Sequence, residues 1–325
     1  MKEISIHEIE GFKLGHAQNE EALTGCSVII SEDGAIGGVD VRGGSPGTRE
    51  TDLLNPQNLV EEVHSVFLAG GSAYGLNVAG GIMKYLEEKN IGFDVQIAKV
   101  PIVTGAILFD LYPGNPNIRP DDQMGYEACQ NAYSSNDNRN GNIGAGIGAT
   151  VGKCLGPQYA MKGGLGTYAL QIGDVKIGAV VAVNCFGDVI DPSTGKVIAG
   201  VYDQASNKYL HSEKVMLDQY KVKEKTNRFK GNTSIGAVLT NVKLTKAQAN
   251  KIASIAHDGF ATTMRPSHTL VDGDTIFALS TNKVEAELNV VGLLAVKVIE
   301  KAVLNAVKMA ESVFGISAYQ DVKSS

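Results

Sequence analysis

The sequence predicts a layered α+β protein, and three observations carry that prediction. Expected strands and helices fall in blocks along the 325 residues, which argues against a strictly alternating, doubly wound sheet. The segment 175–183 is an almost continuous apolar run, typical of a strand covered on both faces. The 38 glycines alternate with Val, Ile and Ala in strand-like segments, which indicates tight turns and close backbone packing rather than disorder.

The first half of the chain predicts a hairpin followed by two helices. A turn at Glu32-Asp33-Gly34 separates two apolar strands, and Ser72 is the expected N-cap of the first helix. Pro- and Asn-rich composition marks the loops. In chain order we expect strands over 26–31, 36–41 and 63–68, a helix over 73–88, a loop over 113–122, a helix over 123–133 and a loop over 134–142.

The second half predicts a further hairpin, a linker and then mixed elements. Gly173-Asp174 is the expected hairpin turn, and Thr245 with Gln248 forms a capping box at a helix start. Segment 200–231 is polar and Lys-rich (Lys208, Lys214, Lys221, Lys223, Lys225, Lys230), which favours an exposed surface linker. The expected elements are strands 168–172 and 175–183, strand 234–239, helix 245–262, strand 275–279 and helix 284–313.

The composition of the chain argues against several classes of binding partner. The net charge is −6 and no Lys or Arg stripe exists, so nucleic acid and membrane surfaces are unfavourable partners, and small neutral or amine-bearing substrates fit better. No apolar stretch reaches the roughly 20 residues that span a bilayer. The N-terminus lacks an apolar signal core, and the four cysteines are far apart, so we expect a soluble, cytoplasmic protein. These cysteines are Cys26, Cys129, Cys154 and Cys185.

Three short motifs resemble known sites but lack the required context. The segment 144–149 matches a dinucleotide loop, yet the residues before it are polar rather than an apolar strand. Gly152-Lys153 has neither the spacing nor the following Ser or Thr of a phosphate loop. Segment 43–47 reads G-x-S-x-G, but Pro46 has no N–H for an oxyanion hole, so we expect Arg42 and Arg49 to fix a glycine turn or an interface. We therefore expect no cofactor.

The six histidines show no metal-ligand spacing, so we expect no metal. His257 lies near a helix end, where a packing or capping role is favoured over catalysis.

The dipeptide Asn232-Thr233 is the most informative feature. It places a hydroxyl after a plausible self-cleavage joint and before an apolar strand. If the chain cuts itself there, Thr233 gains a free amine with a pKa of about 7.7–8.0, so one residue supplies nucleophile and base. The plainer interpretation is a loop residue followed by an ordinary β-former.

Four further residues support the functional interpretation, although each has a plain structural alternative. Asp272 and Asp274 can be a tight turn, or carboxylates that accept hydrogen bonds from the Thr233 hydroxyl and ammonium. Asn184 can terminate a strand or point its NH2 at an oxyanion. Lys153 can be surface charge, but its small apolar flanks suggest a buried lysine paired with a carboxylate.

Several segments together resemble the self-processing P1 peptidase family, which is peptidase family S58. They are 39–44 (VDVRGG), 68–76 (LAGGSAYGL), 100–103 (VPIV), 148–153 (GATVGK), 232–236 (NTSIG), 256–259 (AHDG) and 272–275 (DGDT). The family includes D-aminopeptidase/esterase, β-peptidyl aminopeptidase, pantetheine hydrolase and nylon-oligomer (6-aminohexanoate oligomer) endohydrolase. The Asn-Thr joint and the D-x-D pair resemble the endohydrolase branch more than the others.

The resemblance implies a four-layer αββα fold like that of N-terminal nucleophile hydrolases. It further implies a single domain over 1–325, cut into chains 1–232 and 233–325 that stay together as a homotetramer. By the same resemblance, Thr233 is the nucleophile, the two aspartates orient it, Asn184 forms the oxyanion hole, and Lys153 lies nearby. Tyr112 and Tyr74 are candidates to contact substrate, although Phe109 lies in the better-matching frame for the family's site tyrosine.

The expected activity is hydrolysis of amide bonds in small amides or oligoamides, including 6-aminohexanoate oligomers. An aminopeptidase for D-amino-acid or β-peptidyl substrates, or a pantetheine-type amidase, is the alternative enzyme. The non-enzymatic alternative is an uncut binding or assembly protein with the same fold.

Overall fold

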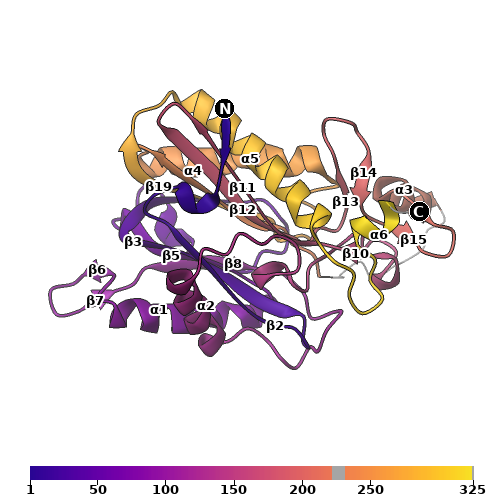
Figure 1. Cartoon of the computed structure of the whole chain (residues 1–325), viewed down its shortest axis with the longest axis horizontal. Helices are drawn as coiled ribbons and strands as arrows, with labels where there is room; N and C mark the ends of the chain where they lie inside the picture. The colour runs from indigo at the N-terminus through magenta and orange to yellow at the C-terminus, as the bar shows by residue number, and fades with distance from the viewer. Residues whose placement is uncertain (222–230, 324–325) are drawn as a thin grey trace.

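A computed structural model describes residues 1–221 and 231–323 (Figure 1). Its centre is a ten-stranded sheet in the order β1-β11-β12-β17-β19-β3-β5-β8-β4, with β2 paired to β3. The strands are β1 Lys2–Ile4, β2 Lys13–Asn19, β3 Thr24–Val41, β4 Thr48–Arg49, β5 Glu62–Ala69, β8 Val103–Ile107, β11 Gly164–Ile172, β12 Val175–Val183, β17 Ile235–Val242 and β19 Thr275–Val284.

Six α-helices and several short strands complete the described residues. The helices are α1 Val78–Glu88, α2 Asp122–Ser134, α3 Ser212–Lys221, α4 Lys246–Thr263, α5 Leu288–Lys308 and α6 Tyr319–Lys323. The short strands pair as β6 Phe93–Asp94 with β7 Lys99–Val100, β9 Thr150–Val151 with β10 Met161–Lys162, and β15 Tyr202–Asp203 with β16 Lys208–Tyr209. A three-stranded unit joins β13 Asp188–Ile190, β14 Val197–Ala199 and β18 Met264–Arg265.

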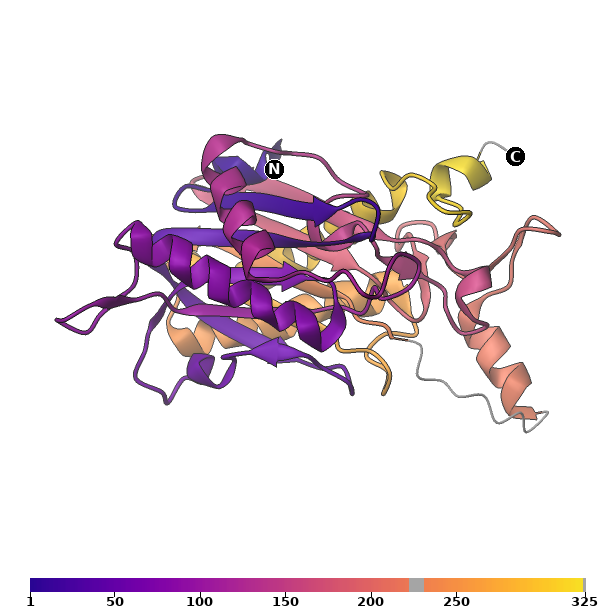
Figure 2. The same cartoon turned by 90° about the horizontal axis from the view of Figure 1, so that it is seen from below.

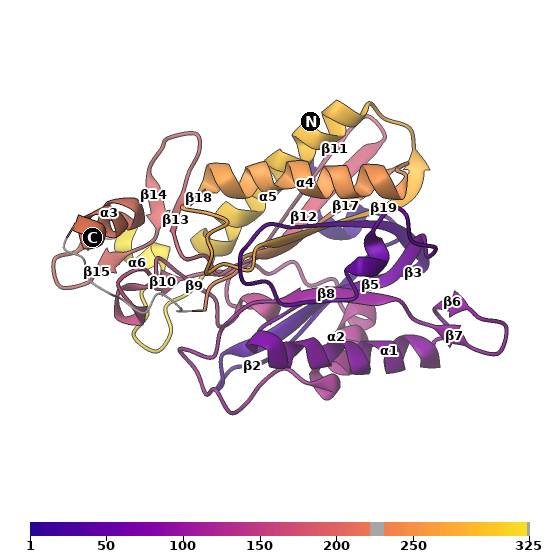
Figure 3. The ribbon, with the colours of Figure 1, turned by 180° about the vertical axis from the view of Figure 1, so that it is seen from behind.

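The elements stack in four layers, αββα. Helices α4 and α5 cover the outer face of β11, β12, β17 and β19, while α1 and α2 cover β2, β5 and β8 (Figures 2 and 3). Three apolar cores fill the interfaces: one beneath α4 and α5, one between the two sheet layers, and one beneath α1 and α2. The predicted fold class is confirmed.

Strand β12 shows how the sequence encodes this sandwich. Val181 and Val183 face the core beneath α4 and α5, while Val180 and Ala182 face the core between the sheet layers. Successive side chains of a strand point to opposite faces, so both faces must be apolar when both are covered. The predicted hairpin of β11 and β12 and the Thr245 capping box of α4 are also present.

The predicted hairpin around Glu32-Asp33-Gly34 is wrong, because these residues lie inside the single strand β3. Its first half pairs with β2 and β5 and its second half with β19, so β3 joins the two sheet layers. Gly34 has φ +80°, and the β3–β5 register shifts between Ile30 and Ala35. The glycine therefore serves a bulge rather than a reversal of the chain.

Two other local predictions need correction. Ser72 starts a 3-10 helix, Ser72–Asn77, and its side chain does not cap α1, whose N-cap residue is Asn77. The segment predicted as a linker contains the β15–β16 pair and α3, which lies at one end of the molecule (Figure 2). Lys223, Lys225 and Lys230 lie outside the described residues.

Within the described ranges, no helix has the length and apolar character needed to cross a bilayer. No group of three or more His, Cys, Asp or Glu side chains in these ranges is arranged to hold a metal ion. All four cysteines are buried.

Candidate active site

Three strands bring the predicted site residues to one edge of the sheet. In the paired registers, Ala182 of β12 lies opposite Ile235 of β17, and Ile235 lies beside Thr275 of β19. Asn184 therefore follows one strand at the point where Thr233 and Asp274 precede the other two. Residues about 40 to 50 positions apart meet because β12 runs antiparallel to β17 and β17 runs parallel to β19.

Thr233 is buried at this edge, with 3% of its surface exposed. Its backbone N–H donates to the carbonyl oxygen of Asn184 at 3.0 Å, and its Oγ1 accepts a hydrogen bond from Gly273 N–H at 3.0 Å. The hydroxyl donates to the carbonyl oxygen of Asn232, the residue before it. A hydroxyl held against the preceding carbonyl group is the starting arrangement for transfer of an acyl group from nitrogen to oxygen.

Lys153 is buried beside this backbone. Its Nζ donates to Asn184 O at 3.0 Å, to Asn184 Oδ1 at 2.8 Å and to Gly231 O at 3.3 Å. The expected carboxylate partner is therefore replaced by carbonyl and amide oxygens. Burial lowers the pKa of Lys153 from 10.5 to about 7, because these neutral acceptors do not offset the loss of hydration.

The Asn184 amide has a fixed orientation. Its Oδ1 accepts hydrogen bonds from Lys153 Nζ and from Thr150 N–H at 2.9 Å, so its NH2 group is the side-chain donor. That NH2 donates to Phe109 O at 2.9 Å. In this structure the amide NH2 therefore contacts a backbone carbonyl group.

The two aspartates hold the backbone around Thr233 rather than its hydroxyl. Asp274 Oδ1 accepts from Ser234 N–H at 2.8 Å, and Asp272 Oδ1 accepts from Phe186 N–H at 3.2 Å. The hydroxyl's partner is instead Gly273 N–H, between the two aspartates. Burial and the charge of Asp274 raise the pKa of Asp272. Among the described residues, neither carboxylate forms a hydrogen bond with the Thr233 hydroxyl, and the expected contact with a Thr233 ammonium group stays a prediction.

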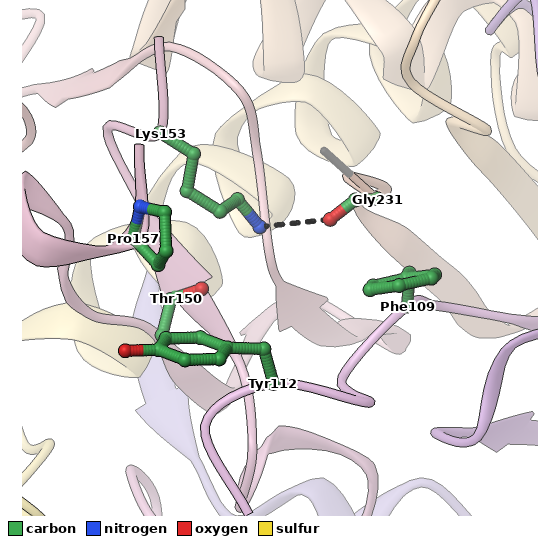
Figure 4. Close-up of a pocket in the computed structure, with 6 residues that line it drawn as sticks. All are labelled: Phe109, Tyr112, Thr150, Lys153, Pro157 and Gly231. Atoms are coloured by element: carbon green, nitrogen blue, oxygen red, sulfur yellow. Dashed lines mark hydrogen bonds between the residues drawn. The ribbon is translucent and has the colours of Figure 1, made fainter. Parts of the chain in front are cut away.

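A pocket of about 240 Å³ opens beside Lys153 and Gly231 (Figure 4). It is lined by Phe109, Tyr112, Thr150, Lys153, Pro157 and Gly231. Tyr112 lines this pocket, and its contact with substrate stays a prediction. Tyr74 is not among the lining residues, and Arg119 packs over its ring at 3.8 Å.

The glycine motif 43–47 supports the aspartate turn. A Cβ atom on Gly43 would lie 2.3 Å from Asp274 N and 2.4 Å from Asp272 O, so only glycine fits there. Ser45 N–H donates to Asp272 O at 2.8 Å. The segment therefore packs against the loop that carries both aspartates, while the Arg42 and Arg49 side chains donate to Ser254 and Met83.

Sequence reasoning missed three contributors to the site. Gly273 supplies the N–H at the Thr233 hydroxyl, and His268 contacts Asp274 through both its backbone and its ring. Asp110 follows Phe109 and is held by Gly71 N–H at 2.6 Å and Thr24 Oγ1 at 2.8 Å. Burial raises the pKa of Asp110 to about 6. The 68–76 motif was the available signal for Asp110, because a Cβ on Gly70 would collide with its carboxylate.

Solved structures share this architecture over nearly the whole chain. The L-aminopeptidase D-Ala-esterase/amidase of Ochrobactrum anthropi, described as a variant of the Ntn hydrolase fold, superposes with a TM-score of 0.68 at 18% identity, covering 98% of this chain and 92% of that one. A Burkholderia sp. β-aminopeptidase gives 0.66 at 15% identity, covering 98% and 93%. The protein therefore has the fold of the N-terminal nucleophile hydrolases.

The chain belongs to peptidase family S58, whose model matches residues 5–320. An uncharacterized aminopeptidase of Mycobacterium leprae is 39% identical, covering 97% of this chain and 93% of the relative. A 6-aminohexanoate-oligomer endohydrolase of Agromyces sp. is 30% identical, covering 87% and 77%. The protein is accordingly a hydrolase that acts on amide bonds.

Proposed function

We propose that the protein cuts itself between Asn232 and Thr233 and then hydrolyses amides with Thr233 as its N-terminal nucleophile. The observation that carries this proposal is the buried Thr233 hydroxyl, which contacts the Asn232 carbonyl oxygen and accepts Gly273 N–H. The products are chains 1–232 and 233–325, which share one set of cores and therefore stay associated.

Self-cleavage proceeds by an N-to-O acyl shift. Thr233 Oγ1 attacks the Asn232 carbonyl carbon, the peptide C–N bond breaks, and the hydroxyl proton passes to the departing nitrogen. Water then hydrolyses the ester, which leaves a carboxylate on Asn232 and a free amine on Thr233.

In each turnover the freed amine acts as the base. It accepts the Oγ1 proton during attack on a substrate amide and returns it to the leaving amine, and water then hydrolyses the acyl-enzyme ester. Lys153 Nζ shares the acceptor Asn184 O with the Thr233 nitrogen, so a charged lysine there favours the neutral amine that serves as base. Asn184 Nδ2 stabilises the oxyanion, and the two donors at its Oδ1 support that orientation.

The substrate class we favour is an oligoamide with apolar spacers, such as a 6-aminohexanoate oligomer. Phe109, Tyr112 and Pro157 offer apolar surface for methylene chains in the pocket. The ionisable group among the described lining residues is the Lys153 amine, which does not attract a substrate ammonium. An internal amide therefore fits better than a free amino terminus.

An aminopeptidase activity is the second candidate, because relatives at 39% identity carry that name. Matched oligomers with free and acetylated amino termini separate the two. An endohydrolase cleaves both, whereas an aminopeptidase requires the free amine. D-amino-acid amides, β-peptides and pantetheine complete the substrate panel.

Denaturing mass spectrometry of the purified protein tests the self-cleavage. We expect two masses, for 1–232 and 233–325, and one full-length mass for Thr233→Ala, which should also lack amidase activity. Ser234→Ala removes the neighbouring hydroxyl and is the matched control, which should still be cut. An intact wild-type chain that hydrolyses amides would refute the proposal.

A further inference from the structure

His268 contacts the Asp274 carboxylate through two hydrogen-bond donors. Its backbone N–H lies 3.0 Å and its ring Nδ1 lies 2.9 Å from the same oxygen, Asp274 Oδ2. His268 adopts φ +54°, which is uncommon for a residue other than glycine and costs conformational free energy. A strained backbone that delivers two donors to one carboxylate oxygen indicates a constraint imposed by the site.

The His268 ring has no other hydrogen-bond partner among the described residues. Its Nε2 is buried and unpaired, and the ring packs against His257 at 4.8 Å and Phe260 at 6.4 Å between centroids. His257 directs its own Nε2 to Asp40 O at 3.0 Å. Because Nδ1 faces a carboxylate oxygen, we assign the proton of the His268 ring to Nδ1, which then donates a hydrogen bond to Asp274.

Asp274 fixes the backbone on both sides of the Thr233 hydroxyl. Its Oδ1 accepts Ser234 N–H at 2.8 Å, which holds the residue after the nucleophile. Its neighbour Gly273 donates the N–H that meets Thr233 Oγ1 at 3.0 Å. Movement of Asp274 would therefore change the position of Ser234 N–H relative to Gly273 N–H.

The partners of the two carboxylates also differ in kind. Three hydrogen bonds among the described residues reach the Asp274 carboxylate, and all come from N–H donors: one from Ser234 and two from His268. Asp272 contacts the Thr269 hydroxyl in addition to backbone N–H groups. Two of the three described donors to the Asp274 carboxylate therefore belong to His268.

We propose that His268 is a positioning residue that fixes the Asp274 carboxylate and so holds Thr233 and Ser234 in place against Gly273 N–H. This inference rests on the proposed function of Thr233. It assigns a role in self-cleavage and turnover to a side chain that does not touch the Thr233 hydroxyl.

Substitution of His268 by Asn, Ala and Gly tests the proposal. Asparagine places an NH2 group near the position of Nδ1 and tolerates a positive φ, alanine removes the donor, and glycine removes the donor and the strain together. The readouts are the rate of self-cleavage, kcat and KM of the matured enzyme, and thermal unfolding to confirm folding.

Loss of one charge-assisted hydrogen bond corresponds to about a 10- to 100-fold loss of rate. We expect this loss in kcat and in the cleavage rate for His268→Ala and His268→Gly, with KM nearly unchanged, and recovery to near the wild-type rate for His268→Asn. A folded His268→Ala protein with wild-type rates would overturn the proposal. A folded His268→Asn protein as slow as His268→Ala would overturn it as well.

These outcomes are distinct from failure of the proposed function. If the wild type remains uncut yet is active, the role of Thr233 is wrong. If the wild type is cut and the His268 variants match it, only the role of His268 is wrong.

Discussion

Replacing Lys153 with methionine is expected to stabilise the protein and abolish its chemistry. The displacement of the Lys153 pKa from 10.5 to about 7 means that the folded protein disfavours the charged amine by about 5 kcal/mol. Removing the lysine leaves Gly231 O without this donor, which costs about 1–3 kcal/mol, while Asn184 Oδ1 keeps Thr150 N–H. The free energy of unfolding should therefore rise by about 2–4 kcal/mol at neutral pH.

The pKa shift of Lys153 also predicts how the difference in stability between the two proteins changes with pH. Between pH 7 and 10.5 the unfolded lysine binds a proton that the folded lysine has lost, so stability of the parent protein rises with pH in that window. The advantage of Lys153→Met is therefore full at pH 7 and below and disappears toward pH 10.5. Lys162, which burial also shifts to a pKa of about 7, is present in both proteins, so most of its effect cancels.

The assay is urea unfolding at pH 6, 8 and 10 with both proteins in the Thr233→Ala background, so that neither is cut. With Thr233 intact, Lys153→Met should slow self-cleavage by at least about 100-fold. Lys162→Met is the matched control, because its ammonium contacts the carbonyl groups of Gly146, Ala149 and Gly163 instead of Asn184, and it should still be cut. Lower stability of Lys153→Met at pH 6, or an advantage that is equal at pH 6 and 10, would refute the reasoning.

Three further substitutions probe the same site. Asn184→Asp replaces the NH2 donor with an acceptor and should lower kcat of the matured enzyme by about 100- to 1000-fold in an amidase assay, whereas an unchanged kcat would exclude the oxyanion role. Gly231→Ala places a Cβ 2.0 Å from the Phe109 ring at φ +56°, so we expect slower cleavage and a lower melting temperature by calorimetry, whereas equal values would show that the loop adapts freely. Asp272→Asn tests the raised pKa of Asp272: the wild type should lose stability as pH rises above the unfolded pKa near 3.8, and unfolding curves of the variant should lack that loss.

The strand ends and the site glycines together explain why this edge of the sheet is suited to chemistry. Three strands deliver Thr233, Asn184 and Asp274 from a rigid sheet with both faces covered, so their backbone positions are well fixed. Glycines at 43 and 231 let neighbouring loops approach closely, where a Cβ atom would collide with backbone or ring atoms. Rigidity from the sheet and close approach from glycine thus combine at one place.

Local features of the sequence predicted most elements correctly. The alternating apolar faces of β12, the capping box of α4 and the apolar strand after Thr233 are each set by residues close together in the chain. The hairpin at Glu32 to Gly34 was wrong because a turn and a bulge share the same residues. The pairing of β3 with the distant strands β5 and β19 decides in favour of the bulge.

By itself, the sequence determined the layered fold, the Asn232-Thr233 joint before a strand, and the residue types available for the chemistry. Only the tertiary structure decided which atoms meet: Lys153 with amide oxygens instead of a carboxylate, Gly273 N–H at the Thr233 hydroxyl, and His268 on Asp274. The physical reason is the distance along the chain over which each interaction acts. Propensity and capping act over a few residues, whereas hydrogen-bond partners and the hydration of a buried charge depend on segments that folding brings together from far along the chain.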